Sequence, residues 1–151
     1  MKNIRVFSFV VKYFGFLKVI PLTPHVFDGL LRLWSLLTKA EVLEWMDEIE
    51  GEILTWEGVS VGMHKYGGLQ FDYKKREIGH LHGNGLVDIS FNRGQKQLLL
   101  KEGRISNHHV LNNTGWISFM LKSKSDVNYV KYLLKISYDH KKNKQIQQNL
   151  L

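Results

Sequence analysis

The first part of the chain follows a helical pattern of apolar and polar positions. Residues 4–20 are mostly apolar and aromatic and carry one narrow polar stripe. The stripe consists of Arg5, Ser8, Lys12, Gly15 and Lys18. Spacings of three and four residues predict an amphipathic helix. Two interpretations fit it: a helix that covers the domain or a partner subunit, or one that lies in a membrane interface with its lysines toward the headgroups.

A second helix is expected after the two prolines. Thr23 is a suitable N-cap and Pro24 suits the first helical position, which predicts a helix over 24–37. Its polar stripe consists of Asp28, Arg32 and Ser35, and leucines and Trp34 surround that stripe. We expect this helix to be largely buried.

A third helix has a clear start signal. Thr38 and Glu41 have the spacing of a capping box, and Gly51 is the expected stop. The apolar face is predicted to consist of Val42, Met46 and Ile49.

The middle of the chain changes to short alternating runs, which predict strands. The expected strands are 53–56, 59–65, 69–73, 77–82, 86–91 and 116–121. Gly67-Gly68 indicates a hairpin, and 74–76 reads as a solvated turn. Further helices are expected at 94–102 and 125–138, after which the polar tail is expected to fray.

This order of elements predicts an α+β fold. We expect an antiparallel sheet of about five or six strands, packed on one face by N-terminal and C-terminal helices. The domain organisation follows: a basic amphipathic segment at 1–23, one α+β domain at 24–138 and a basic polar tail at 139–151.

The charge distribution narrows the function classes. The net charge is +7, but residues 1–24 alone contribute four basic side chains and no acid, and 139–151 contribute a net +2. The part between them is nearly neutral, so nucleic acid is not an expected partner. The chain has no cysteine, which excludes disulfides and thiolate metal sites. No apolar run reaches the roughly 20 residues that span a bilayer, and we expect a cytoplasmic protein whose membrane contact is limited to a peripheral one through 1–20.

The histidines are the candidate chemistry. Residues two apart on a strand share a face, so His80 and His82 are expected to point the same way. Asp88 lies on a neighbouring predicted strand and could face them. Adjacent residues on extended backbone point apart, so only one of His108 and His109 is expected to join the group.

These residues support two kinds of site. The predicted metal ligands are His80, His82 and His109, which suit zinc or iron, and Asp88 could complete the set. Without a metal, a histidine paired with Asp88 or Glu77 could transfer protons near neutral pH. A hydrogen-bonded structural cluster is the alternative without chemistry. The chain has neither a Gly-x-Ser-x-Gly elbow nor a phosphate loop.

Several motifs in order resemble one known family. They are Phe27-Asp28-Gly29-Leu30-Leu31-Arg32, His64-Lys65-Tyr66-Gly67-Gly68, Arg76-Glu77-Ile78-Gly79-His80-Leu81-His82-Gly83, His108-His109-Val110-Leu111 and Gly115-Trp116-Ile117-Ser118-Phe119. Together they are similar to the small "luciferase domain" family of bacteria and fungi over about residues 24–140.

The resemblance implies the same α+β domain and a recurrent residue set. That set contains His80, His82, Asp88, His108, His109 and Trp116, which become ligand-binding candidates. Where the family tends to have a proline and an acid, this chain has Asn112-Asn113-Thr114. The family name implies neither a luciferin substrate nor a flavin. We therefore expect a domain of unknown function that binds a small ligand or protein partner in a histidine-rich polar cleft. The alternatives are a metal-dependent or histidine-based enzyme in the same cleft, and a membrane-surface or assembly module acting through 1–20.

Overall fold

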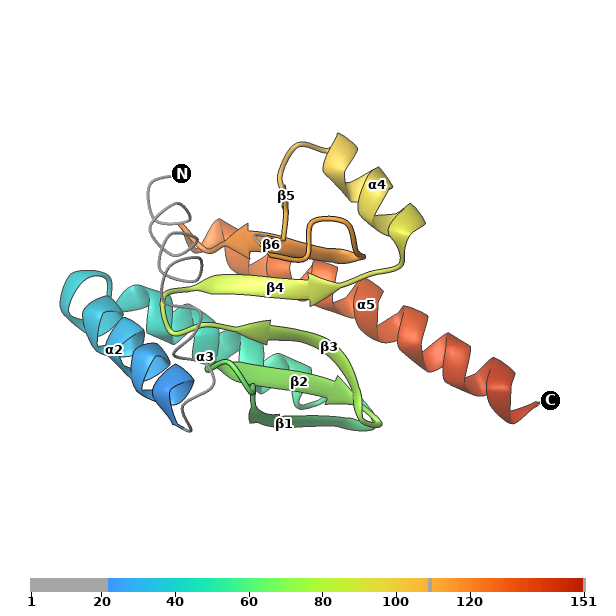
Figure 1. Ribbon diagram of the computed structural model, residues 1–151, viewed down its shortest axis with the longest axis horizontal. Helices are drawn as coiled ribbons and strands as arrows, with labels where there is room; N and C mark the ends of the chain where they lie inside the picture. Colours follow the sequence, from blue (N-terminus) through green and yellow to red (C-terminus); the bar gives the residue numbers. More distant parts are fainter. Residues whose placement is uncertain (1–21, 109, 151) are drawn as a thin grey trace.

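A six-stranded antiparallel sheet forms the centre of the protein (Figure 1). The structure is a computed structural model that describes residues 22–108 and 110–150. The elements in this part of the chain are α2 (Thr23–Thr38), α3 (Glu41–Ile53), β1 (Val59–Met63), β2 (Leu69–Tyr73), β3 (Arg76–Leu81), β4 (Leu86–Ser90), α4 (Arg93–Lys101), β5 (Ser106–Asn107), β6 (Trp116–Met120) and α5 (Ser125–Asn149). The strand order is β1-β2-β3-β4-β6-β5. The predicted α+β class is therefore confirmed. The amphipathic helix expected over 4–20 lies outside the described residues.

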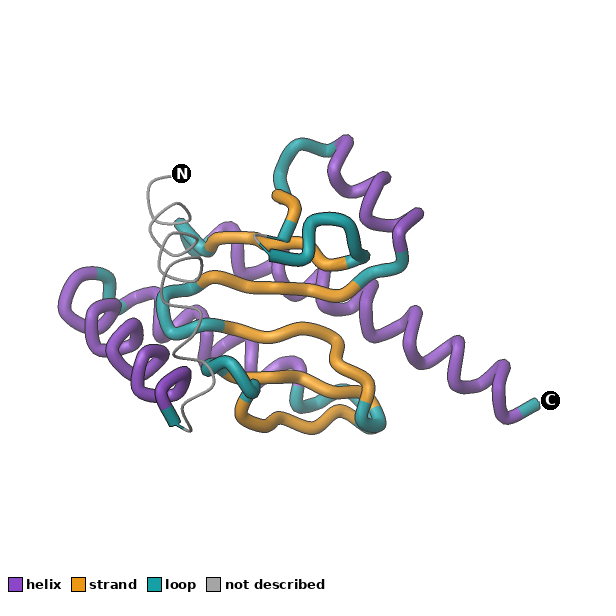
Figure 2. The backbone as a smooth tube through the Cα atoms, in the orientation of Figure 1, coloured by secondary structure: helices purple, strands orange, loops and turns teal. Residues whose placement is uncertain are grey.

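The hydrophobic core lies on one face of the sheet, where α3 and α5 cover it (Figure 2). The strand residues that point into this core include Phe71, Leu81, Val87, Ile89, Ile117 and Phe119. Val42, Met46 and Ile49 of α3 are buried against them, as the periodicity predicts. Burying each large apolar side chain contributes about 1.5–3 kcal/mol. Because side chains alternate along a strand, the positions between these residues point to the opposite face, and these are mainly polar.

Helix α2 is much less buried than predicted. Two of the three residues of its polar stripe face inward: Ser35 is buried, and an Asp28 carboxylate oxygen accepts a hydrogen bond of 2.8 Å from the backbone N–H of Gly83. Six large apolar side chains of α2 are instead 52–74% exposed: Val26, Leu30, Leu33, Trp34, Leu36 and Leu37. The prediction of a largely buried helix was wrong because amphipathicity alone does not say which side faces the protein. The carboxylate satisfies a backbone donor that apolar side chains could not.

Several predicted boundaries were also wrong. The Thr38 hydroxyl donates to the Trp34 carbonyl at 2.8 Å, so it ends α2 and caps no helix, and the N-cap of α3 is Ala40. Helix α3 continues through Gly51 to Ile53, so no strand forms at 53–56. Likewise, Thr23 lies within α2 and is not its cap.

The C-terminal helix is longer than predicted. Helix α5 runs to Asn149, through the segment expected to fray. Lys142 binds the Glu57 carboxylate at 2.7 Å, and the half-buried Lys141 donates to the Ser90 carbonyl at 3.0 Å. These contacts hold the extension against the sheet. A search of the described helices for one long and apolar enough to cross a membrane found none.

Candidate functional site

Asp88 is the centre of a polar cluster on the face of the sheet opposite α3 and α5. It lies in β4 between the core residues Val87 and Ile89, and its side chain is fully buried. The strand register pairs Asp88 with His80 of β3 on one side and with Ser118 of β6 on the other. Because directly paired residues point to the same face, three strands deliver three polar side chains to one point.

Three imidazoles converge on a single carboxylate oxygen of Asp88. The Nε2 atoms of His80 and His82 each lie 3.3 Å from Asp88 Oδ2, and the Nε2 atom of His108 lies 3.5 Å from it. The other oxygen, Oδ1, accepts a hydrogen bond from the Ser118 hydroxyl. His80, His82 and His108 are only 5–7% exposed. The expected common face of His80 and His82 is therefore present, and His108 joins them.

A β-bulge brings Glu77 into the cluster. Phe71 pairs with Gly79, but the next residue, Asp72, pairs with Glu77, so β3 has one extra residue at this point. In a regular strand residues three apart point to opposite faces, whereas the bulge puts Glu77 and His80 on the same face. His80 Nδ1 lies 2.6 Å from Glu77 Oε1. The His80 ring is thus held between two carboxylates.

His82 has a similar arrangement with a carboxylate from α2. Its Nδ1 atom lies 3.9 Å from Asp28 Oδ1, the same oxygen that accepts the Gly83 N–H. Each of His80 and His82 therefore presents Nε2 to Asp88 and Nδ1 to a second acid. Since α2 supplies Asp28, the position of that helix bears directly on the cluster.

The tautomer of His108 is fixed by its own loop. Its Nδ1 atom accepts hydrogen bonds from the backbone N–H groups of Val110 and Leu111, at 3.1 and 2.9 Å. An accepting nitrogen carries no proton, so in neutral His108 the proton is on Nε2, which faces Asp88. The ammonium of Lys96 holds the far side of this loop through the carbonyls of Asn112 and Thr114, at 2.7 and 2.8 Å.

His64 is a member of the cluster that the sequence did not single out as a site residue. Its ring stacks on His80 with centroids 3.8 Å apart and planes 10° from parallel, and its buried Nδ1 atom has no hydrogen-bond partner. The Gly67-Gly68 hairpin could have indicated the position of His64. The Gly68 carbonyl accepts the His64 N–H, so the hairpin places this residue over β3. Ser118 was likewise missed, although it alternates with core residues on β6.

The remaining predicted site residues have different outcomes. Trp116 lies at the edge of the cluster, with its ring 5.5 Å from that of His80 and 6.0 Å from that of His108. His109, a predicted metal ligand, lies outside the described residues.

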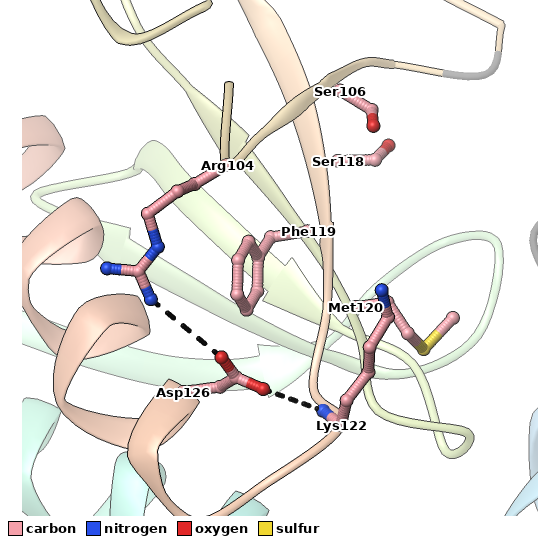
Figure 3. A pocket seen from close by; sticks show the side chains of 7 residues that line it. All are labelled: Arg104, Ser106, Ser118, Phe119, Met120, Lys122 and Asp126. Atoms are coloured by element: carbon pink, nitrogen blue, oxygen red, sulfur yellow. Dashed lines mark hydrogen bonds and ion pairs between the residues drawn. The ribbon is translucent and has the colours of Figure 1, made fainter. Parts of the chain in front are cut away.

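The imidazoles of the cluster are buried, and the histidine-rich polar cleft stays a prediction. Two cavities border the cluster, of about 190 and 220 Å³, and neither is lined by His80, His82 or His108. The first reaches the cluster only through Ser118, whose hydroxyl points toward that of Ser106 (Figure 3). Its far end holds Arg104, 3.9 Å from the Asp126 carboxylate. The second includes Asp28.

Burial and the neighbouring charges together set the pKa values of the side chains in the cluster. Burial alone would lower the pKa of His80, but its bonds with Asp88 and Glu77 outweigh this effect and raise the pKa to about 9. Burial would raise the pKa of Asp88, yet the three imidazoles hold it well below its usual range. Burial and the neighbouring His80 lower the pKa of His64 to about 4. At neutral pH a cationic His80 therefore lies between two anions, with a neutral His64 stacked on it.

This arrangement predicts a loss of stability at alkaline pH for the ion-free protein. A base whose pKa is raised by folding stabilises the fold while it is protonated. The contribution of His80 is complete below its ordinary pKa of 6.5 and disappears as the pH rises to about 9. We expect the free energy of unfolding to fall by on the order of 3 kcal/mol over that interval. Urea unfolding at a series of pH values measures it, and His80→Gln should flatten the curve. An equally steep curve in that variant would contradict the assignment.

The fold and the cluster define the class of protein: an α+β domain with histidines around a buried aspartate on the outer face of its sheet. The model of the Luciferase domain family matches residues 75–137. This segment is similar to that family, and the resemblance inferred from the motifs is confirmed over it. It includes Glu77, His80, His82, Asp88 and His108, whereas Asp28 and His64 precede it. Searches of curated proteins and of solved structures returned no match.

Proposed function

We propose that this protein binds one divalent transition-metal ion, zinc or iron(II), through His80 Nε2, His82 Nε2 and Asp88 Oδ2. The observation that carries the proposal is the convergence of imidazole nitrogens on one oxygen of a fully buried carboxylate. These three residues offer ligand atoms that all lie within 4.8 Å of one another. Two imidazoles and one carboxylate form a common ligand set for both ions.

The distances favour an ion over hydrogen bonds alone. Hydrogen bonds between an imidazolium and a carboxylate are normally about 2.7–2.9 Å long. Both His80 and His82 lie 3.3 Å from the Asp88 oxygen. Ligand atoms bound at about 2.0–2.1 Å to a tetrahedral ion are about 3.3–3.4 Å from each other. The two separations from Asp88 match the spacing expected of ligand atoms around one ion, which supports the proposal.

The carboxylates next to His80 and His82 are also placed to support metal binding. A metal-binding histidine commonly donates its other N–H to a carboxylate, which fixes the tautomer and orients the ring. Glu77 is in position to do this for His80, and Asp28 faces the corresponding atom of His82. Because the His108 Nδ1 atom accepts two backbone N–H groups, its Nε2 keeps its proton. His108 is thus assigned as a hydrogen-bond donor to Asp88 rather than as a ligand.

The proposal replaces the predicted set of His80, His82 and His109 by one in which Asp88 is the third ligand. Three protein ligands leave a coordination position for water or a substrate, as in catalytic rather than structural sites. A small organic ligand among the histidines is the competing function. The burial of the imidazoles favours the ion, because neither bordering cavity is lined by them.

Elemental analysis of protein purified without a histidine tag tests the proposal. We expect about one zinc or iron per chain, and a fall to less than a tenth of that in His80→Ala. His140→Ala is the matched control, since His140 lies on α5 outside the cluster and should leave the metal content unchanged. Protein that stays metal-free after incubation with zinc and with anaerobic iron(II) would overturn the proposal. Equal metal content in His80→Ala and the wild type would also overturn it.

A further inference from the structure

The cavity of about 190 Å³ lies at the edge of the sheet, where β5 ends. Strand β5 is two residues long and pairs with β6 over that length. Arg104 precedes this paired stretch, and the cavity opens between Arg104 and the β6 residues Phe119 and Met120 (Figure 3). Pockets for drug-sized ligands measure about 300–1,000 Å³, so a ligand of this cavity is smaller than those.

Arg104 offers hydrogen-bond donors to this cavity. Its guanidinium Cζ atom lies 3.6 Å from the ring centroid of Tyr129, and a cation held over a ring in this way is oriented before a ligand binds. Asp126 Oδ1 lies 3.9 Å from the guanidinium, which is too far for a hydrogen bond. The other oxygen of Asp126 accepts the backbone N–H groups of Lys122 and Ser123, both at 3.0 Å. Among the described residues, no hydrogen bond therefore engages the Arg104 guanidinium.

The charge and polarity of the lining identify the chemical class of the ligand. Two cations, Arg104 and Lys122, and one anion, Asp126, line the cavity, so a single negative charge on a ligand would neutralise it. The planar fork of a guanidinium matches the two oxygens of a carboxylate. Phe119 and Met120 add apolar surface beside these charges, and the Phe119 ring lies next to Arg104 in Figure 3. This combination suits a carboxylate that carries a short hydrocarbon chain better than an inorganic anion.

We propose that this cavity binds a small organic monocarboxylate. Its carboxylate accepts hydrogen bonds from Arg104, its hydrocarbon chain packs on Phe119 and Met120, and Lys122 adds positive potential. The site does not depend on the proposed metal ion, because the imidazoles of the cluster do not line the cavity.

NMR titration of the ¹⁵N-labelled full chain with matched probes tests the proposal. We expect saturable binding of valerate with a dissociation constant of about 1 mM or lower, reported by the amides of Phe119 and Met120 and the Nε–H of Arg104. Acetate, which lacks most of the hydrocarbon chain, and 1-pentanol, which lacks the charge, should each bind at least about tenfold more weakly. Glutarate, a dianion of the same length, should bind no more tightly than valerate.

Arg104→Gln removes the charge and the fork at a half-exposed position, and it should weaken valerate binding at least about tenfold. Arg93→Gln is the matched control, since Arg93 is exposed at the start of α4 and does not line the cavity. Its affinity for valerate should equal that of the wild type. Thermal unfolding verifies that both variants are folded.

Several outcomes would overturn the proposal. Valerate that shows no saturable binding, or binds no better than 1-pentanol, would exclude a carboxylate site. Tighter binding of glutarate would contradict the monocarboxylate class. Equal valerate affinity in Arg104→Gln and the wild type would remove the assigned donor. If a chelator abolished that unchanged affinity, the carboxylate would be bound by the metal ion, which would refute this cavity site and leave the proposed function standing.

Discussion

Replacing Asp88 with asparagine is expected to abolish stoichiometric metal binding and to lower the free energy of unfolding by about 3–5 kcal/mol. The carboxylate is fully buried and accepts from Ser118 while three imidazoles face its other oxygen. An amide has no charge to balance the cationic His80. The NH2 group of the amide is also a donor, whereas the Ser118 hydroxyl and the imidazole N–H groups at this position need an acceptor.

Urea unfolding and elemental analysis of the Asp88→Asn variant measure both effects. Asp139→Asn makes the same change at a half-exposed position on α5, where the carboxylate pairs with Lys135, and it should change stability by less than about 1 kcal/mol. If Asp88→Asn does not fold, His82→Gln provides the metal measurement. Normal metal content in either cluster variant would refute the ligand assignment, and unchanged stability of Asp88→Asn would refute its electrostatic role.

Replacing Gly83 with alanine is expected to cost about 3 kcal/mol and to displace α2. The new Cβ would lie 2.7 Å from the Asp28 carbonyl oxygen and 2.8 Å from the Arg32 backbone nitrogen. Backbone atoms of a helix cannot move singly, so the whole helix must shift. That shift removes the acceptor of the Gly83 N–H and the acid that faces His82.

Gly29→Ala is the matched control for this effect. Gly29 lies on the same helix, and a Cβ there would meet nothing within 4 Å. Alanine is favoured over glycine in a helix by about 1 kcal/mol, so this variant should be slightly more stable than the wild type. Urea unfolding gives the comparison, and hydrogen exchange of the α2 amides reports the displacement. Equal stability of the two alanine variants would show that α2 is not constrained by Gly83.

The sequence predicted the structure well where the spacing of residues along one strand determines the direction of their side chains. Spacing of two along a strand was enough to predict that His80 and His82 share a face, and that Asp88 on a neighbouring strand could face them. The expected strand 69–73 coincides with β2, since turn residues bound it on both sides. These features depend on neighbours in the chain and therefore appear in its pattern.

The rest of the cluster depends on contacts that no local pattern records. The bulge that turns Glu77 toward His80 is visible only when β2 and β3 are paired. The role of Asp28 requires α2 to face Gly83 with its polar side, against the usual rule that leucines face inward. The proton position on His108 follows from two backbone donors of a loop whose path could not be inferred.

The ends of the helices also depend on contacts that the sequence pattern does not record. The Thr38–Glu41 spacing indicated a capping box, yet the Thr38 hydroxyl is used by the preceding turn. The capping box that the structure contains joins Asn92 and Gln95 at the start of α4. Two helices that follow each other closely compete for the same hydroxyl, and the sequence does not say which one takes it.

The near-complete burial of the imidazoles has a kinetic consequence. An ion held among them could leave only when the loop after His108 or helix α2 moves, and Lys96 and Gly83 hold these two segments in place. Exchange would then be limited by the rate of local opening and not by the strength of the competing chelator. Raising the chelator concentration would speed removal of the ion only up to a plateau, and the height of that plateau would measure how often the site opens.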